Sequence, residues 1–417
     1  MSDSVQEKVV INPVIQDAIR LTGIEGHELS DLKFKGVDIV TGIEHVFAMR
    51  TEDTPPRIPQ SDHHFTLSDL DETLCKKFKV LNVMGQGRFS TVYAAVDLRK
   101  KRKVALKVYR SSDEFLEYFN HEVNLLKRIE GKSHPNVVAC HGHFTIQTKR
   151  GLHGVIIFDL VPNTVKNLLR TNKKGVPLKQ AKHITNQVAK GLAFLHLHGL
   201  IHADIKPENL LIDDIGLVKI CDIGSGCLAD SVDSFRVGTI PYIAPEILLG
   251  CKYDNKADVW SLACLFFELA TNSCPFDPEI YFKSQSDYGS RTNSTTSESC
   301  SSQSIEESDW SQASSSEDED EFFDQEITHF QLCHFKKLLG DFPHDLFSDG
   351  IYYPLFFNSC KAFRVVPRYI DDRPLATVMI DDLDIAADDA VAIESECLKL
   401  LKLDPRERPV AADVFIK

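Results

Sequence analysis

Two short polar segments constrain this chain more than any other feature of its sequence. The first runs from His202 to Asn209, and the second, Asp222-Ile223-Gly224, begins thirteen residues after that asparagine. Asp204 can orient an attacking hydroxyl group, while the amide of Asn209 and the carboxylate of Asp222 are hard oxygen donors that suit Mg²⁺. This spacing fits transfer of a phosphoryl group, because that reaction asks the protein mainly for positioning and charge neutralisation.

A glycine-containing turn upstream fits the binding of phosphate. The strand-like run Leu81–Met84 leads into Gly85-Gln86-Gly87, and a second strand-like run containing Ser90 and Val92 follows. Two glycines let backbone N–H groups approach a phosphate closely. Two glycines alone are equally typical of a hairpin turn, so the neighbouring motifs decide the interpretation.

A lysine and a glutamate complete the set of motifs expected of a phosphoryl-transfer site. Lys107 ends the alternating run Val104-Ala105-Leu106-Lys107, and Glu122 lies fifteen residues later in a helical pattern. That separation lets a strand lysine pair with a helix glutamate, which would hold the ammonium group against the phosphates of a nucleotide. Each element alone has an ordinary structural explanation, but their joint order and spacing favour a phosphoryl-transfer site.

Together these motifs resemble the signature set of the eukaryotic protein kinases, over residues of about 73–417. The resemblance extends to Gly238–Glu246, similar to the end of an activation segment, and to Arg408, which would pair with Glu246. It implies an α+β, bilobal protein kinase fold, with a small antiparallel β lobe that carries one main helix and a larger, mainly α-helical lobe. The small lobe would span 73–160 and the large lobe 161–417, after an N-terminal extension and linker over 1–72.

The resemblance also implies the site. ATP and Mg²⁺ would bind between the lobes, with Asp204 orienting a serine or threonine hydroxyl, Lys206 contacting the γ-phosphate and the adenine touching the backbone near Asp159. The implied catalytic residues are Asp204, Lys206, Lys107 and Glu122. The implied nucleotide-binding residues are Gly85, Gln86, Gly87, Ser90, Val92, Ala105, Lys107, Asp159, Val161, Asn209 and Asp222, of which Asn209 and Asp222 would hold the metal.

A closer resemblance is to the SR-protein kinases of the CMGC group. It is carried by Phe89-Ser90-Thr91-Val92, by the hinge-like run His153–Asp159 and by Ala257–Ala270. It implies protein substrates that are basic or rich in arginine-serine repeats. Ala203 stands where an arginine normally precedes the catalytic aspartate, which predicts activity that does not depend on a phosphorylated activation segment.

Other positions depart from that family. Ile240 and Ile243 stand where SR-protein kinases carry arginines, and Lys336 and Lys337 stand where their docking groove is acidic. Two alternatives therefore stay open. One is a CMGC-like serine/threonine kinase with a different substrate specificity, and the other is a pseudokinase scaffold that binds partners without catalysis.

Net charge and cysteine spacing limit the partners and the cellular location that we expect. A net charge of −14 argues against nonspecific binding of nucleic acid and is compatible with basic protein substrates. The eleven cysteines form no C-x-x-C pair, and we find no signal peptide or apolar run of membrane length. We therefore expect a monomer in the cytoplasm or nucleus that contacts no membrane.

A serine-rich, acidic stretch interrupts the large lobe at about 281–326. It contains the run Ser314–Glu321 and holds too few apolar residues to offset the entropy of ordering, so we predict a disordered insert. Two roles stay open for it. It is either a tolerated expansion of a surface loop or a segment that recruits or competes with basic ligands.

Overall fold

The structure is a computed structural model that describes residues 77–231, 237–276, 316–364 and 373–416, with 316–326 described by their backbone alone. The predicted extension over 1–72 and the first part of the predicted insert, 281–315, lie outside these residues.

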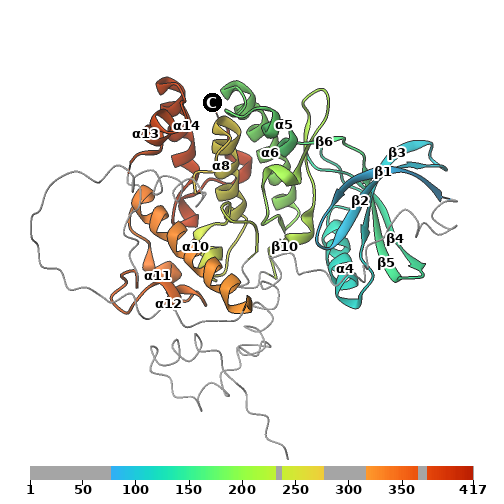
Figure 1. Ribbon diagram of the computed structural model, residues 1–417, viewed down its shortest axis with the longest axis horizontal. Helices are drawn as coiled ribbons and strands as arrows, with labels where there is room; N and C mark the ends of the chain where they lie inside the picture. Colours follow the sequence, from blue (N-terminus) through green and yellow to red (C-terminus); the bar gives the residue numbers. More distant parts are fainter. Residues whose placement is uncertain (1–76, 232–236, 277–315, 365–372, 417) are drawn as a thin grey trace, which may run out of the picture.

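A five-stranded antiparallel sheet forms one end of the molecule, in the strand order β1-β2-β3-β5-β4 (Figure 1). Asp97 caps the turn between the second and third strands by accepting hydrogen bonds from the backbone N–H groups of Arg99 and Lys100. The strands are β1 (Phe78–Gln86), β2 (Ser90–Asp97), β3 (Arg102–Tyr109), β4 (Cys140–Thr148) and β5 (Gly151–Asp159).

One helix, α4 (Asp113–Lys127), packs against this sheet. Ser112 caps its N-terminus by accepting a hydrogen bond from the backbone N–H of Phe115, and Asp113 and Glu114 complement the positive end of the helix dipole. Its inward face buries Phe119 and Val123, and that packing places Glu122 on the side toward the catalytic segments.

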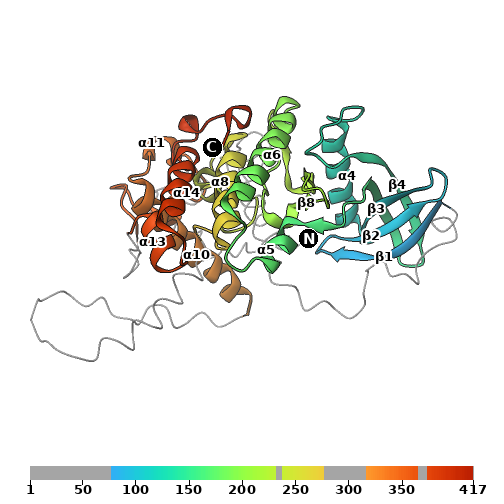
Figure 2. The same ribbon diagram turned by 90° about the horizontal axis from the view of Figure 1, so that it is seen from above.

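The larger lobe is built around α8 (Lys256–Thr271), in which every residue from Ala257 to Thr271 is buried. A helix that is buried on all sides lies in the middle of a lobe, and Figure 2 shows α8 between α6 and α14. The other helices are α5 (Val165–Thr171), α6 (Leu178–Leu197), α7 (Pro245–Leu248), α10 (Ser316–Leu339), α11 (His344–Phe347), α12 (Tyr353–Phe356), α13 (Leu375–Asp381) and α14 (Ala387–Leu400).

Short strands position the loops between the lobes. A three-stranded sheet has the order β6-β8-β9, and β10 pairs with β7. These strands flank the predicted catalytic loop and metal-binding turn, so both segments start and end on ordered backbone. Their bounds are β6 (Asn163–Thr164), β7 (Leu200–Ile201), β8 (Leu210–Ile212), β9 (Val218–Ile220) and β10 (Cys227–Leu228). The predicted fold class, a small antiparallel β lobe with one main helix and a larger helical lobe, is confirmed.

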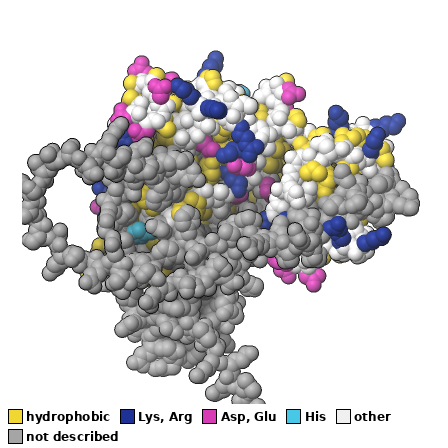
Figure 3. Space-filling view, viewed as in Figure 1, with side chains coloured by type: hydrophobic (Ala, Val, Ile, Leu, Met, Phe, Trp, Pro, Cys, Tyr) yellow, Lys and Arg dark blue, Asp and Glu magenta, His cyan; other side chains and the backbone are white. Residues whose placement is uncertain are grey.

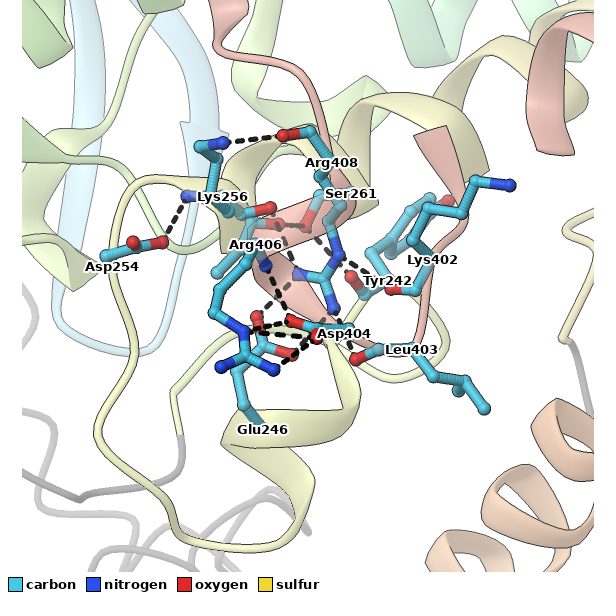
Figure 4. Close-up of polar contacts among 11 residues, drawn as sticks. Tyr242, Glu246, Asp254, Lys256, Ser261, Lys402, Leu403, Asp404, Arg406 and Arg408 are labelled. Atoms are coloured by element: carbon cyan, nitrogen blue, oxygen red, sulfur yellow. Dashed lines mark hydrogen bonds and ion pairs between the residues drawn. The ribbon is translucent and has the colours of Figure 1, made fainter. Parts of the chain in front are cut away.

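Glu246 and Arg408 join two distant parts of the helical lobe. The Nη1 and Nη2 atoms of Arg408 donate to the two carboxylate oxygens of Glu246 at 2.5 and 2.8 Å (Figure 4). The guanidinium also lies 5.1 Å from the ring centroid of Trp260. Both partners are 1% exposed. The predicted pair is confirmed, and it ties the start of α7 to the segment after α14.

The prediction of disorder over 281–326 is wrong for its last part, because helix α10 begins at Ser316. Acidic residues fill the first turns, Glu317–Glu321, where negative charge is favourable next to the N-terminal end of the helix dipole. Farther along, Phe330, Leu332 and Phe335 are buried in the lobe. That packing anchors the helix from beyond the predicted insert, so the composition of the insert alone does not reveal it.

No helix in the described part of the chain is both long and apolar enough to cross a membrane. In the view of Figure 3, Lys and Arg side chains surround the sheet, whereas basic and acidic side chains are intermixed over the helical lobe.

Candidate active site

The structure brings Lys107, Glu122 and Asp222 together from three elements. The Nζ atom of Lys107 on β3 lies 2.7 Å from Oε2 of Glu122 on α4 and 2.7 Å from Oδ1 of Asp222, at the turn after β9. Glu122 is fully buried, while the Asp222 side chain is 47% exposed. The lysine therefore joins a buried carboxylate to one that a ligand can still reach.

Charge pairing keeps this cluster ionised. Burial alone would lower the pKa of Lys107, but the carboxylates of Asp222 and Glu122 outweigh it and hold the pKa well above its ordinary value. In turn, the Lys107 ammonium holds the pKa of Asp222 below its ordinary value. A cation and a ligating carboxylate are thus both present at neutral pH.

Tyr109 is a member of this cluster that the sequence analysis missed. Its hydroxyl donates a hydrogen bond to Oε2 of Glu122, the same oxygen that Lys107 contacts. Tyr109 follows Lys107 by two residues on β3, so the two side chains share one face of the sheet. That period of two was the signal that could have identified it.

The glycine turn lies beside this lysine. The strand register pairs Gly85 with Val92 and Val92 with Lys107, so the three residues lie side by side across β1, β2 and β3. The N–H of Gly87 donates to the carbonyl of Ser90 at 2.8 Å and closes the turn. A Cβ on Gly85 would meet no atom within 4 Å, which leaves open space next to its backbone.

The remaining predicted nucleotide-binding residues border the same region. Gln86 is paired with Thr91 at the end of the β1–β2 ladder, and Ala105 is buried on β3. At the end of β5, Asp159 contacts the His141 ring at 2.7 Å, and its N–H donates to the carbonyl of Ala139. Val161, 6% exposed, follows in the connection to the helical lobe.

A second cluster surrounds Asp204. Its Oδ1 accepts a hydrogen bond from Thr239 Oγ1 at 2.7 Å, and its Oδ2 lies 2.8 Å from both Lys206 Nζ and Asn209 Nδ2. Lys206 Nζ also donates to Thr239 Oγ1 at 2.6 Å. The predicted catalytic residues of this loop are therefore brought together, with Asp204 held from both oxygens. Thr239 was quoted in the motif Gly238–Glu246, but its contact with Asp204 was not predicted.

The two clusters are tied together through the backbone. The backbone N–H of Cys221 donates to the carbonyl of Asn209 at 3.0 Å. The carbonyl of Cys221 accepts a hydrogen bond from the His202 ring, also at 3.0 Å. Asp222 itself has left-handed backbone dihedrals, φ 59° and ψ 65°, which turn the chain sharply after β9. This turn brings the Asp222 carboxylate to Lys107.

Asp258 on α8 holds the catalytic loop from below. Its oxygens accept hydrogen bonds from the N–H groups of Ala203 at 2.8 Å and His202 at 2.9 Å, and one of them lies 2.7 Å from Nε2 of His196. Ala203 has a positive φ of 60°, a conformation that costs energy for a residue other than glycine. The fully buried carboxylate therefore stabilises a strained backbone just before Asp204.

We expect Asp258→Asn to lower the free energy of unfolding by about 3 kcal/mol at neutral pH, because an amide cannot accept all of these hydrogen bonds. Contacts with His196 and His202 outweigh burial and hold the pKa of Asp258 below its ordinary value. The contribution of the ionised carboxylate is thus fully present above the unfolded pKa, about 3.9, and is lost as the pH falls through the lower folded value. Urea unfolding at several pH values should show that the difference in the free energy of unfolding between wild type and variant becomes smaller below about pH 4.

Asp384→Asn is the matched control, since the Asp384 side chain is 85% exposed and pairs with an exposed lysine. Its unfolding midpoint should equal that of the wild type. An Asp258→Asn variant as stable as this control would show that Asp258 does not support the loop.

The donor set of the site fits Mg²⁺. Asp222 is ionised and exposed. The Nδ2 of Asn209 donates hydrogen bonds to Asp204, which leaves the amide oxygen of Asn209 as an acceptor. Within the described residues, no group of three or more His, Cys, Asp or Glu side chains could hold a metal ion unaided. Mg²⁺ commonly binds in proteins through one or two side chains, with phosphate oxygens and water completing its octahedron.

One further group beside the site was not predicted. Lys166 on α5 lies 3.3 Å from Glu208, which precedes Asn209, and 3.4 Å from Glu268 on α8. The Tyr242 hydroxyl donates to the other oxygen of Glu268. Burial raises the pKa of Glu268, while Tyr242 and Lys166 oppose that rise. No local pattern joins residues so far apart in the sequence.

Comparison with known proteins agrees with this geometry. Residues 78–415 match the protein kinase domain family. The chain is 24% identical over 404 residues to a serine/threonine-protein kinase SRPK of Physarum polycephalum, which covers 82% of this chain and 85% of the relative. It is 36% identical over 196 residues to cyclin-dependent kinase 4 of Xenopus laevis, a match that covers 45% of this chain and 60% of that relative. It is 35% identical over 207 residues to serine/threonine-protein kinase TAO1-A of the same species, a match that covers 48% of this chain and 20% of that relative.

Proposed function

Because the chain belongs to the protein kinase family and is a protein serine/threonine kinase, we propose that it transfers the γ-phosphoryl group of ATP to serine or threonine hydroxyls in basic, arginine-serine-rich proteins. The observation that carries the proposal is the cluster around Asp204, in which Thr239, Lys206 and Asn209 hold both carboxylate oxygens within 2.8 Å. A carboxylate held in this way has the fixed direction that orienting a hydroxyl requires.

Each residue then has a chemical role. Mg²⁺ bound with ATP supplies charge neutralisation of the phosphates, and Asn209 and Asp222 would hold it. Lys107, kept in place by Glu122 and Tyr109, binds the phosphates of the nucleotide. Asp204 orients the hydroxyl and accepts its proton as the hydroxyl oxygen bonds to the γ-phosphorus. The bond between that phosphorus and the bridging oxygen breaks and releases ADP, while Lys206 stabilises the negative charge on the transferred group.

Two observations support basic substrates. The relative from Physarum polycephalum that matches most of this chain is named SRPK, and the chain carries a net charge of −14, which attracts cationic segments. The acidic residue Glu208 adjoins the catalytic loop with its side chain 45% exposed, and a cationic substrate would compete there with Lys166, which lies 3.3 Å from it.

A second candidate is a kinase of the same broad group with another specificity. Ile243 is 5% exposed and Ile240 packs against the main hydrophobic core, so neither position carries a charge toward a substrate. At the end of α10, Lys336 pairs with Asp341 at 2.9 Å and lies over the ring of Phe363. That end of the helix is basic, which would repel an arginine-rich docking segment.

A direct assay separates these candidates. The full chain is incubated with labelled ATP, Mg²⁺ and an arginine-serine repeat peptide, beside an alanine-serine repeat of equal length and a serine/threonine peptide library, with Asp204→Asn as the inactive control. We expect the arginine-serine repeat to be preferred by about tenfold or more, equivalent to about 1.4 kcal/mol. Preference for other library sequences would discard the proposed substrate and keep the kinase. ATP binding without transfer to any peptide would indicate the noncatalytic scaffold.

A further inference from the structure

A cavity of 220 Å³ lies behind helix α4, and the residues of the candidate active site do not line it. Its walls come from the C-terminal half of α4, the segment after it, the start of β4, and α6. The apolar wall includes Val123, Leu126 and Phe194, and the rim includes Lys127, Glu130, Lys132 and Cys140.

Size and charge define what can fill this cavity. Pockets for drug-sized ligands usually measure about 300–1,000 Å³, so this smaller one suits a single aromatic or aliphatic side chain of a peptide segment. Lys127 and Lys132 are exposed and donate hydrogen bonds to neutral oxygens of Asn124 and Arg128. Among the described residues, neither ammonium group is within ion-pair distance of a carboxylate. The two ammonium groups outnumber the single carboxylate of Glu130 on this rim, which therefore favours an acidic segment with one apolar anchor.

We propose that the occupant is the chain's own segment from Asp62 to Glu72, with Phe65 as the anchor. This segment has one aromatic residue, and the acidic residues Asp69, Asp71 and Glu72 follow it. The described chain begins at Lys77, immediately before β1. Phe78 stacks on Phe144 with ring centroids 6.0 Å apart, and the residue before Phe144 in β4, His143, lines the cavity.

The chain between Phe65 and Phe78 is long enough for Phe65 to reach the cavity. Thirteen residues separate Phe65 from Phe78, and an extended chain of that length spans up to about 43 Å. The segment can therefore pass around the edge strand β4 and reach the cavity without any change in the sheet. Because it is tethered, it competes for the cavity at an effective concentration on the order of 1 mM.

Occupation of the cavity would stabilise the position of α4. Val123 forms part of the cavity wall, and its neighbour Glu122 makes the 2.7 Å contact with Lys107. An anchor packed against Val123 and Leu126 would limit movement of the helix away from the sheet. The N-terminal segment thereby supports the lysine–glutamate pair of the nucleotide site from its other side.

The exposed thiol of Cys140 reports on the cavity. Full-length protein is treated with iodoacetamide, and alkylation of Cys140 is followed by mass spectrometry of its peptide, in wild type and in Phe65→Ala. A tethered anchor with a Kd of about 0.1 mM would occupy the cavity about nine-tenths of the time, so removing it should speed alkylation about tenfold. Reversing the rim charge with Lys127→Glu and Lys132→Glu together should have the same effect, and it should not add to that of Phe65→Ala.

Phe47→Ala is the matched control, because it removes an aromatic side chain from the same N-terminal region outside the proposed segment. It should leave the alkylation rate unchanged. Equal rates in wild type and Phe65→Ala, or equal acceleration by both alanine variants, would overturn the proposal. Protection that disappears on dilution of the wild type would assign the cavity to a second copy of the chain and would also overturn it.

Discussion

Replacing Asp204 with asparagine abolishes phosphoryl transfer while the protein stays folded and binds ATP. An amide cannot accept the hydroxyl proton, and its Nδ2 must face a group that now donates to the carboxylate, either Thr239 or Lys206. Loss of a positioned base typically lowers a rate by about 10²–10⁴-fold. Steady-state transfer of labelled phosphate measures the loss, and calorimetric titration with Mg²⁺-ATP should give an affinity within a few-fold of the wild type.

Asp214→Asn is the matched control for this experiment. Asp214 is exposed after β8, close in sequence to the catalytic loop, and should tolerate the same chemical change without loss of rate. An Asp204→Asn variant that keeps more than about a tenth of the wild-type rate would contradict the role of Asp204. Loss of ATP binding in that variant would instead indicate damage to the whole site.

Replacing Arg408 with methionine destabilises the helical lobe by about 3–5 kcal/mol, because it leaves the Glu246 carboxylate buried without its partner. Arg408 also donates to the carbonyls of Lys402 at 2.8 Å and Lys256 at 3.2 Å, so the variant removes links to two further segments. Arg408→Lys should recover only part of the loss, since an ammonium group cannot make the paired contact of the guanidinium. Urea unfolding followed by tryptophan fluorescence measures the change.

Arg406→Met provides a control two residues away. Arg406 makes three contacts with Asp404 of 2.7 to 3.1 Å, which Figure 4 shows beside the buried pair, but its side chain is 72% exposed. Its removal should leave the unfolding midpoint unchanged. Adding Glu246→Gln to Arg408→Met should restore part of the stability, because the uncompensated charge is then gone. If Arg406→Met destabilised the protein as much as Arg408→Met, burial would not be the reason for the effect.

The sequence predicted the elements whose residues lie close together in the chain or follow a fixed motif order. The glycine turn, the strand that carries Lys107, the helix that carries Glu122 and the loop from His202 to Asn209 all lie where their patterns indicated. The pairing of Arg408 with Glu246 was predicted from resemblance alone, and the structure confirms it. Disorder over the end of the insert was predicted incorrectly, because α10 is held by packing of its own residues beyond position 326, which the composition of the insert does not include.

The sequence by itself thus determined the residue types of the site, since motif spacing is a local property of the chain. The fold class was predicted from the resemblance to the protein kinases that those motifs carry. Only the tertiary structure decided which side chains hold those residues in place. Thr239 reaches Asp204 across 35 positions, and Asp258 reaches Ala203 across 55. Such contacts depend on how helices and loops pack in three dimensions, and side chains this far apart in sequence share no period that could predict their meeting.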